Sequence, residues 1–336
     1  MKNFLDIMYD DTKNVRKIKS CDYSDEGKYP IIDQSSKNVI GYTDEIDGIY
    51  KDVPVIIFGD HTRRFKLVEE PFFIGADGTK VLKLRSSVYD YKFIYYYLLH
   101  KKIPDTGYNR HFKWVKELEF PEIPRSIQSD IVKKFEVLND LISSKNKLLE
   151  LFNILIKSRF VEMFGDPNAS RTKYKLVPIH TVTDCMVPGR DKPKSFTGEI
   201  PWITINDLNI NGYTNKSKLG LGLTIDEVKE VNRKCVPQGS VLMSCVGNLG
   251  LCSIASVDVV INQQLHSYQC NEFINNLYLM YYLSFKNTYM NKIASSTTVL
   301  YMNKNACNNI PVLLPPIELQ ISFAKYLNRI NKLKFA

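Results

Sequence analysis

The sequence predicts an α+β fold built from two similar α/β bodies, each followed by a helix that begins at a proline. Two observations predict it. One is a long stretch of helical periodicity near the middle of the chain, and the other is a set of features that recurs in the same order in the second half. Because the repeated unit is long, two separate domains are expected rather than a solenoid.

The long helix is expected between residues 120 and 166. Pro121 and Pro124 open this stretch, and because proline fixes φ and lacks an amide hydrogen, a helix should begin just after them. Apolar residues then recur about every 3.5 residues, as in a helix that packs lengthwise against another helix. This seam is broken only by Lys145 and Arg159 and consists of Ile131, Phe135, Leu138, Ile142, Leu149, Phe152, Ile156 and Met163.

Gly165 and Pro167 end the helix as a C-cap glycine followed by proline should. One helix over residues 127–164 would be about 57 Å long at 1.5 Å per residue. Such a rod would act as a spacer. The alternative is an ordinary amphipathic helix that lies on a single core.

The chain contains a tandem duplication. Pro316 and Gln320 stand four apart, as do Pro124 and Gln128, and an apolar stripe follows each pair. Two more features recur upstream: the aromatic run 93–99 at 277–283, and the apolar run 55–58 at 241–244. Recurrence in one order at nearly constant spacing indicates a repeat. The expected division is a first body at 1–119, a helical region at 120–166, a second body at 167–313 and a second, short helical region at 314–336.

Composition describes an ordinary globular protein. The chain has 336 residues, of which 44% are hydrophobic and 24% charged, so there is room for two cores. No apolar run approaches the 18 or so residues of a membrane span, and the acidic N-terminal segment is unlike a signal peptide, so a cytoplasmic location is expected. Seven cysteines without CxxC pairs or close histidines favour buried reduced thiols over a zinc site: Cys21, Cys185, Cys235, Cys245, Cys252, Cys270 and Cys307.

Polar and cationic side chains of the first body gather in two loops. Residues 55–58 should form a buried strand that emerges into residues 59–64, and residues 93–99 a helix with an aromatic face. Residues 105–114 mix aromatic residues with cations, which can stack on bases and grip phosphates. The net charge of +9 permits a polyanionic partner. Candidate nucleic-acid contacts here are Gln34, Asp60, His61, Thr62, Arg63, Arg64, Tyr108, Asn109, Arg110 and Lys113.

The second body carries a comparable set. A long loop is expected over residues 187–199, strands over 202–205 and 241–244, and side-chain amides that could pair with adenine edges at 262–264. Candidate contacts are Arg190, Lys192, Lys194, Asn248, Asn262, Gln263, Gln264, Thr297, Thr298 and Lys304. In both bodies the competing interpretation is an ordinary solvated turn or edge.

Catalytic interpretations are weaker. Asp60 and His61 could form a dyad, but no nucleophile or metal pattern accompanies them. Asp207, Glu227 and Lys229 could form a nuclease-like set. Glu227, however, follows Thr224 by three residues, a capping-box pattern that predicts a short helix over 224–232. The sequence contains no GxxxxGK[ST] phosphate loop.

Four segments of the chain stand out: YPIIDQ with IGYTDE at 29–45, IIFGDHTRRF at 56–65, GEIPWITINDL at 198–208 and LPPIELQ at 314–320. Through these segments the chain resembles the DNA-specificity subunit of type I restriction-modification systems over nearly its whole length. None is specific alone, but their order together with the duplication is.

The resemblance implies two target-recognition domains, each reading one half of a split DNA sequence, and two helices that pair antiparallel as a coiled coil. It also implies a non-catalytic subunit without cofactors of its own. Modification (M) subunits would carry S-adenosylmethionine and methylate adenine, and restriction (R) motor subunits would use ATP and Mg²⁺. The alternatives are a self-contained nuclease and a coiled-coil adaptor that binds no DNA.

One feature departs from the family pattern. The first helix can span 127–164, whereas only residues 320–336 remain for the second, which would cover less than half of the first. The rest of the apolar seam is expected to be covered by a second copy of the chain or by a modification subunit, unless the chain continues beyond this sequence.

Overall fold

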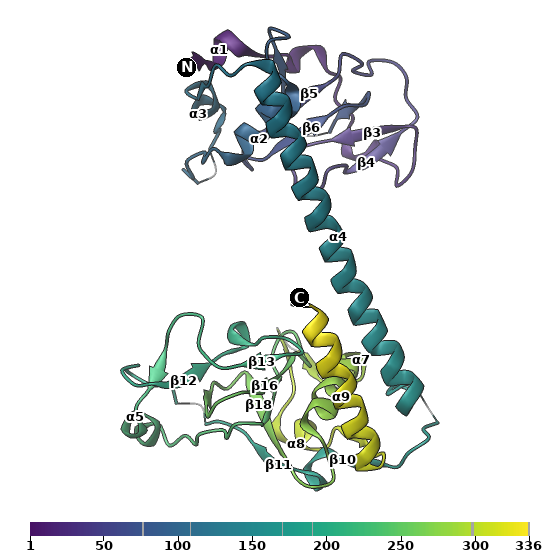
Figure 1. Cartoon of the computed structure of the whole chain (residues 1–336), viewed down its shortest axis with the longest axis vertical. Helices are drawn as coiled ribbons and strands as arrows, with labels where there is room; N and C mark the ends of the chain where they lie inside the picture. Colours follow the sequence, from purple (N-terminus) through teal and green to yellow (C-terminus); the bar gives the residue numbers. More distant parts are fainter. Residues whose placement is uncertain (76, 108, 170, 190, 297–298, 335–336) are drawn as a thin grey trace. The chain divides into compact units, whose positions relative to one another are not determined.

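The computed structural model describes residues 1–75, 77–107, 109–169, 171–189, 191–296 and 299–334. The chain divides into two compact units, Met1–Asn146 and Lys147–Ala336. Helices and strands are mixed in both (Figure 1), which confirms the predicted α+β class.

The first unit is built on a four-stranded antiparallel sheet in the order β2-β8-β5-β6 and a three-stranded sheet in the order β4-β3-β7. Its elements are β1 (Lys2–Asn3), α1 (Phe4–Ile7), β2 (Met8–Asp10), β3 (Tyr29–Ile32), β4 (Gly41–Thr43), β5 (Val55–Gly59), β6 (Phe65–Val68), β7 (Phe73–Ile74), β8 (Thr79–Leu84), α2 (Tyr91–His100), α3 (Phe112–Lys116) and β9 (Glu119–Phe120). Strand β1 pairs with β9.

The second unit is built on a five-stranded sheet in the order β11-β18-β15-β16-β13 and a three-stranded sheet in the order β14-β12-β17. Its elements are β10 (Leu176–Pro178), β11 (Thr183–Met186), β12 (Ile200–Ile203), β13 (Tyr213–Thr214), β14 (Gly222–Leu223), α5 (Ile225–Glu230), β15 (Val241–Ser244), β16 (Cys252–Ala255), β17 (Val260–Ile261), β18 (Leu265–Cys270), α6 (Asn276–Phe285), α7 (Asn287–Ile293), β19 (Ser295–Ser296), β20 (Leu300–Tyr301), α8 (Lys304–Asn308) and β21 (Pro311–Leu313).

Two further helices follow the prolines. Helix α4 (Arg125–Phe164) has 40 residues and is about 60 Å long. It begins two residues earlier than predicted. Helix α9 (Ile317–Lys334) has 18 residues.

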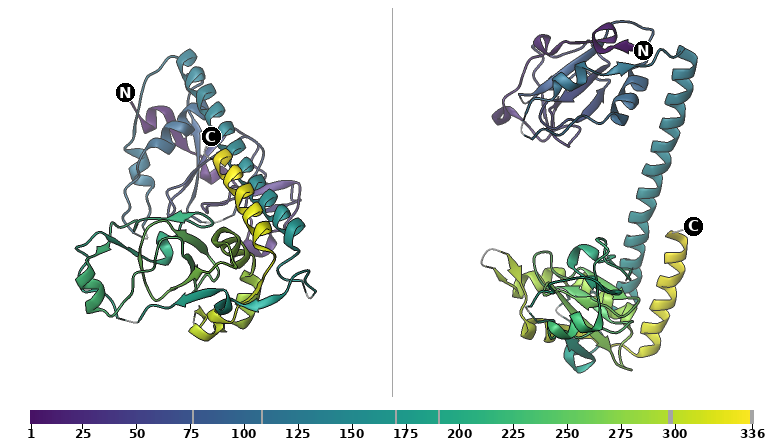
Figure 2. Two further views of the ribbon diagram at one scale, coloured as in Figure 1. Left: turned by 60° about the horizontal axis from the view of Figure 1, so that its bottom comes forward. Right: turned by 90° about the vertical axis from the view of Figure 1, so that its left-hand side faces the viewer.

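Within the second unit, α9 runs antiparallel to the end of α4, as the resemblance implies (Figure 2). The rings of Phe164 and Phe323 have centroids 5.6 Å apart, and Lys334 Nζ donates to Asn153 Oδ1 at 3.0 Å. The later residue of α4 therefore meets the earlier residue of α9. Because α9 ends opposite Asn153, it covers the seam only from there onward.

The predicted seam is consequently covered over part of its length. Ile156 is buried, and Phe152 and Met163 are half-buried against the core of the second unit. Leu138 and Ile142, by contrast, are 52% and 60% exposed. The apolar 3.5-residue pattern of α4 therefore extends beyond the segment of the helix that other described residues cover.

Each unit fastens a helix to its sheet through one fully buried glutamine. Gln128 Oε1 accepts from the amide of Asp90, the N-cap of α2, and Gln320 Oε1 accepts from the amide of Asn275, the N-cap of α6, at 2.8 Å in both cases. Each Nε2 donates to two backbone carbonyls, of Val88 and Ile123 or of Phe273 and Pro315. We name these contacts the glutamine locks. They show that the repeated Pro and Gln mark one structural device used twice.

The strand alignment inferred from sequence is wrong by one residue. It equates Val55 with Val241, but Ile56 and Phe58 face α2, whereas Val241 and Met243 face α6. Ile56 is therefore the equivalent of Val241. Both strands are buried on their two faces, so their apolar runs carry no alternation that would fix the register.

Two other expectations need correction. The strand expected at 202–205 is Ile200–Ile203, because Thr204 starts a capped 3-10 turn with Asp207. The thiols are all free, but only Cys245, Cys252 and Cys307 are buried, and the exposed Cys21 and Cys235 contradict the prediction. Separately, no helix in the described part of the chain is both long and apolar enough to span a membrane.

The glutamine locks generate a prediction. Gln128→Met keeps the side-chain volume but leaves the Asp90 amide and the carbonyls of Val88 and Ile123 without partners, which costs roughly 2–5 kcal/mol. Hydrogen–deuterium exchange should accelerate in peptides of Met1–Asn146 and stay unchanged in those of the second unit. The exposed Gln263→Met is the matched control. Equal acceleration in both units would contradict separate locks.

Candidate nucleic-acid interface

Three loops of the first unit meet where β5 ends. Gly59 closes β5, and a Cβ at this position would lie 2.2 Å from Thr62 Oγ1 and 2.8 Å from Gln34 Cβ, so only glycine fits. Asp60 is 2% exposed, and its Oδ1 accepts the Phe112 amide at 2.7 Å. Its backbone oxygen accepts the His111 amide at 2.9 Å. Asp60 thus ties the loop at 105–111 to the β5–β6 hairpin.

Gln34 ties a third loop to the same place. Its Oε1 accepts from the His61 amide at 3.1 Å and its Nε2 donates to the Asp77 carbonyl at 2.8 Å. Thr62 Oγ1 donates to the Gln34 carbonyl at 2.5 Å. The amide of Gln34 is therefore occupied within the protein. Gln34, Asp60 and Thr62 therefore organise the loop cluster through contacts within the protein.

The cations of the cluster lie at its surface. Arg63 pairs with Asp105 at 2.8 Å, and Arg64 and Arg110 are exposed. Lys113 Nζ lies 4.9 Å from the ring centroid of Trp114. Two further candidates, His61 and Asn109, lie next to each other. His61 Nδ1 is 3.2 Å from the carbonyl oxygen of Asn109, which is exposed. Tyr108 lies outside the described residues.

In the second unit the predicted amides form a tight turn after β17. Asn262 is buried, and its side chain bonds to both the backbone amide and the side chain of Gln264, at 3.1 and 3.0 Å. Gln263, between them, is exposed. The Gln264 carbonyl accepts the Cys245 amide, and the Cys245 carbonyl accepts the Met302 amide. These bonds bring together Asn248, Gln263 and Lys304, all of which are exposed.

The loop at 187–199 carries three further candidates. Lys192 is exposed, and Lys194 Nζ pairs with Glu230 at 3.0 Å on the surface. Arg190, Thr297 and Thr298 lie outside the described residues. Asn262, Gln264 and Lys194 are thus occupied by contacts inside the protein, whereas Asn248, Gln263, Lys192 and Lys304 are exposed.

Arg233 is a positioning residue that was not among the candidate contacts predicted from the sequence. It is buried, and its guanidinium donates to the carbonyls of Asp191 and Ile261 at 2.6 and 2.7 Å. It also lies 4.8 Å from the ring centroid of Trp202. Arg233 thus joins the loop at 187–199 to the strand that leads into Asn262. Its partners are backbone groups far apart in sequence, so no local pattern could reveal them.

The nuclease-like set does not assemble. Asp207 is buried, and its carboxylate accepts from Thr204, Ser217 and Lys218. Glu227 closes the predicted capping box with Thr224 and also binds the hydroxyl of Ser195. Both carboxylates hold loops, and among the described residues no group of three or more His, Cys, Asp or Glu side chains could hold a metal ion. The Asp60 carboxylate likewise caps Phe112, so the Asp60–His61 dyad is not formed.

The comparisons with known proteins agree with one another. Residues 182–336 match the sequence profile of the type I restriction modification DNA specificity domain. The specificity subunit of the Escherichia coli type I restriction enzyme EcoR124I/EcoR124II is 24% identical over 214 residues, which are 60% of this chain and 47% of that protein. The putative MjaX specificity subunit of Methanocaldococcus jannaschii is 23% identical over 252 residues, 72% of this chain and 59% of that one.

Solved structures extend the likeness to the whole fold. The S subunit of a type I system from M. genitalium superposes with a TM-score of 0.59 at 15% identity, covering 99% of this chain and 91% of that one. A structure described as the basis of complex assembly and conformational transition of the type I R-M system gives 0.56 at 16% identity, covering 98% and 87%.

The sequence profile and the curated relatives indicate a type I restriction-modification specificity subunit, and the solved structures share its fold.

The chain spans about half the length of the curated specificity subunits that it matches. The profile match covers the second unit from β11 onward, and the fold of the first unit is supported by the solved structures.

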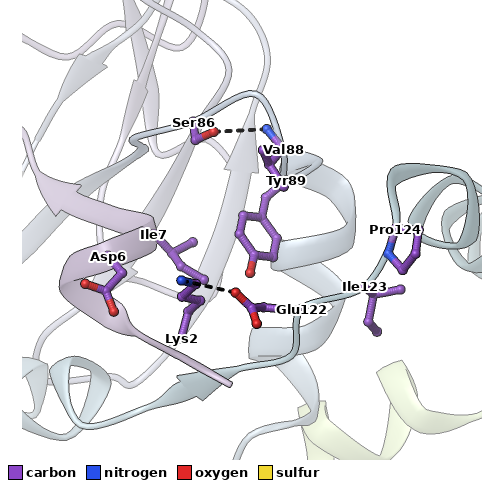
Figure 3. A pocket seen from close by; sticks show the side chains of 9 residues that line it. All are labelled: Lys2, Asp6, Ile7, Ser86, Val88, Tyr89, Glu122, Ile123 and Pro124. Atoms are coloured by element: carbon purple, nitrogen blue, oxygen red, sulfur yellow. Dashed lines mark hydrogen bonds and ion pairs between the residues drawn. The ribbon is translucent and has the colours of Figure 1, made fainter.

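A hollow elsewhere in the first unit is of a different kind. It measures about 640 Å³ and lies beside the β1–β9 pair and the proline that precedes α4 (Figure 3). Lys2 Nζ pairs with Glu122 at 3.2 Å, and Ser86 Oγ accepts the Val88 amide at 3.2 Å. None of the sequence-predicted contact residues lines it. It belongs to the base of the helix and not to the loop cluster.

The Glu227 contacts predict a pH dependence. The hydrogen bond from Ser195, followed by those from the backbone of Thr224 and Thr197, lowers the pKa of Glu227 from 4.5 to about 2. Since the folded pKa is depressed, the contribution to stability is complete above pH 4.5 and is lost as pH falls from 4.5 toward 2. The protection of the Thr197 amide, corrected for the intrinsic pH dependence of amide exchange, should fall over that interval.

Glu227→Gln is the control, since it removes the titrating group and should make the protection of the Thr197 amide, relative to its intrinsic exchange rate, independent of pH over the same interval. A wild-type transition at pH 4.5 would show that the Ser195–Glu227 contact is absent in solution.

Proposed function

We propose that this chain is the DNA-reading subunit of a type I restriction-modification system and that each unit reads one half of a bipartite target. The observation that carries the proposal is a framework used twice with different loops. The sheet, the covering helix and the glutamine lock recur, whereas the residues presented at the loop clusters differ in chemistry.

The two clusters suit different bases. The first presents Arg64, Arg110 and Lys113, and arginine and lysine pair with guanine edges and with phosphates. The second presents the amides of Asn248 and Gln263, the type of group that pairs with adenine edges. An asymmetric split target follows, and the net charge of +9 favours association with DNA.

Chemistry is assigned to companion subunits. The carboxylates that could have formed active centres, Asp60, Asp207 and Glu227, are hydrogen-bonded to backbone groups within loops. We therefore place S-adenosylmethionine on modification subunits, and ATP and Mg²⁺ on restriction subunits. Val137, Leu138, Leu141 and Ile142 expose an apolar face on the part of α4 in the first unit, which supports docking of such a partner there.

Substitutions in the two clusters test this function. The target is first identified by sequencing methylated bases in host DNA with and without this chain. Binding by the chain with its methyltransferase subunits is then measured by fluorescence anisotropy on duplexes in which one half-site is scrambled. Arg110→Ala and Gln263→Ala should each weaken binding about tenfold, the lower part of the 1–3 kcal/mol range for one base contact.

The two losses should fall on opposite half-sites, so that scrambling one half abolishes the effect of only one substitution. Lys19→Ala and Gln238→Ala, exposed residues outside the clusters, are matched controls. Equal affinity for the target and a fully scrambled duplex, or unchanged binding by both cluster variants, would instead favour an adaptor that reads no DNA.

A further inference from the structure

A second hollow of the first unit opens between the loop at 33–38, the turn at 63–66 and the end of α2. Its volume of about 370 Å³ lies at the lower end of small-molecule sites. Four cationic residues and no described carboxylate are among the residues that line it: Ser35, Ser36, Asn38, Arg63, Arg64, Phe65, Lys66, Tyr95, Leu98, Leu99 and Lys101.

Lys66 builds the wall of this pocket. It is buried, and its Nζ donates to the carbonyls of Asp33 and Lys37 at 2.6 and 2.5 Å. The Asp33 carboxylate lies 3.7 Å away. Burial lowers the pKa of Lys66 and the charge of Asp33 partly offsets this. Lys66 therefore holds the loop at 33–38 in place and is electrically balanced by Asp33.

Two of the remaining cations, Arg64 and Lys101, have no acidic partner among the residues that the structure describes. Arg63 is paired with Asp105. Arg64 is exposed, and its guanidinium makes no hydrogen bond or ion pair with any residue that the structure describes. Lys101 Nζ lies over the ring of Tyr97, 4.5 Å from the centroid. After the pairs are discounted, the pocket keeps two positive charges, from Arg64 and Lys101.

A hydroxyl in the same pocket also lacks a partner. Ser35 Oγ is buried and forms no hydrogen bond with the described residues. A buried hydroxyl without a partner is destabilising. An acceptor that enters the pocket would satisfy it, and the neighbouring Ser36 and Asn38 offer further donors.

Comparison of the two copies of the framework shows that the cations of this pocket are specific to the first unit. In the first unit the Gly59 amide bonds to the Arg64 carbonyl and the Arg63 amide to the Gly59 carbonyl, and the corresponding pairs in the second are Ser244 with Leu251 and Gly250 with Ser244. Arg63 is thus equivalent to Gly250, and Arg64 to Leu251.

Strand pairing likewise equates Lys66 with Ser253, because each lies opposite the β5 or β15 residue that faces away from the helix. Lys101 follows α2 as Lys286 follows α6, but Lys286 is buried and donates to the Pro167 carbonyl at 2.7 Å. The second unit therefore has the turn without the charged pocket.

The turn itself supports a functional reason for the arginine. Gly250 has φ +76°, and Arg63 has φ +59° at the same position. Glycine adopts this left-handed conformation readily, whereas a residue with a side chain such as arginine is strained in it. The first unit thus keeps a strained arginine where its sister copy has the unstrained residue.

We propose that this pocket binds one phosphate group of the DNA backbone and that it fixes the position of the first unit alone on its half-site. Arg64 and Lys101 supply the charge, and Ser35 supplies a donor that is already desolvated. The inference rests on the proposed function and deepens it, because it assigns to one of the two reading heads an anchor that carries no sequence information.

The test compares Arg64→Ala/Lys101→Ala with Lys19→Ala/Lys102→Ala. The second pair removes the same charge from the same unit at exposed residues outside the pocket. Binding of the split-site duplex by the chain with its methyltransferase subunits is measured from low to high salt. The pocket variant should bind about tenfold more weakly, as loss of a charge-assisted contact implies. Its plot of log K against log salt should be shallower by about 0.9, the contribution of one phosphate. The control should match the wild type.

Arg64→Leu separates folding from binding. It installs the residue that the sister turn carries at this position and removes one of the two charges assigned to the pocket, so thermal stability should stay the same, whereas the DNA affinity should fall. Ser35→Ala should likewise weaken binding without lowering stability. Wild-type affinity in both variants would overturn the proposal.

The remaining outcomes distinguish the possible failures. If the wild-type complex binds its target and the two charge pairs behave alike, the pocket is overturned and the proposed function stands. If inorganic phosphate, titrated by NMR into the full chain, binds through Arg64 and Lys101 while the salt dependence on DNA is unchanged, the ligand is a free anion and the DNA assignment is wrong. If the wild-type complex does not select a target, the proposed function fails first, and this inference with it.

Discussion

The structure depends on two buried glutamine side chains. Gln128 and Gln320 each lie at the start of a helix and accept a hydrogen bond from the N-cap amide of the helix that covers the sheet. A fully buried amide must satisfy both its carbonyl and its NH₂ group, and each of these does so with backbone groups only. The start of each long helix is thereby fixed to its own sheet through main-chain atoms. Loop side chains can change without disturbing that attachment, because none of them takes part in it.

This separation of framework from loops explains how one duplicated architecture can carry two chemistries. The hairpin turn shows it most clearly: the same two backbone bonds close it in both units, yet one copy places Arg63 and Arg64 where the other places Gly250 and Leu251. A second layer of residues holds the loops from within, Asp60 and Gln34 in the first unit and Arg233 and Glu227 in the second. Their polar groups are consumed by backbone partners, so the residues left to meet a ligand are fewer than the polar residues of the loops.

Sequence reasoning succeeded where the signal is local or periodic. Two prolines and an apolar repeat were sufficient to predict α4, and Thr224 with Glu227 was sufficient to predict a capped helix. It failed where the same sequence pattern is compatible with two different structures. The apolar run at β5 is buried on both faces, so nothing in it distinguishes Ile56 from Val55 as the residue under α2. The seam on α4 continues through Leu138 and Ile142, although α9 ends opposite Asn153. Asp60 was predicted to contact nucleic acid, and Arg233 was not predicted to have a role. Both errors arise because the partners of these residues lie about 40–50 residues away in the chain.

We propose that α4, which runs from the first unit into the second, sets the spacing of the two half-sites while the loop clusters set their sequences. This proposal is tested most directly by inserting about two helical turns, seven residues of alanine, glutamate and lysine, after the exposed Ser144. The insertion lies outside the segment paired with α9 and keeps the following residues on nearly the same helix face. Methylome sequencing should then show both half-site sequences unchanged and the gap between them longer by about three base pairs, since about 10 Å of helix corresponds to about three steps of 3.4 Å. An unchanged gap, or an altered half-site sequence, would contradict the account.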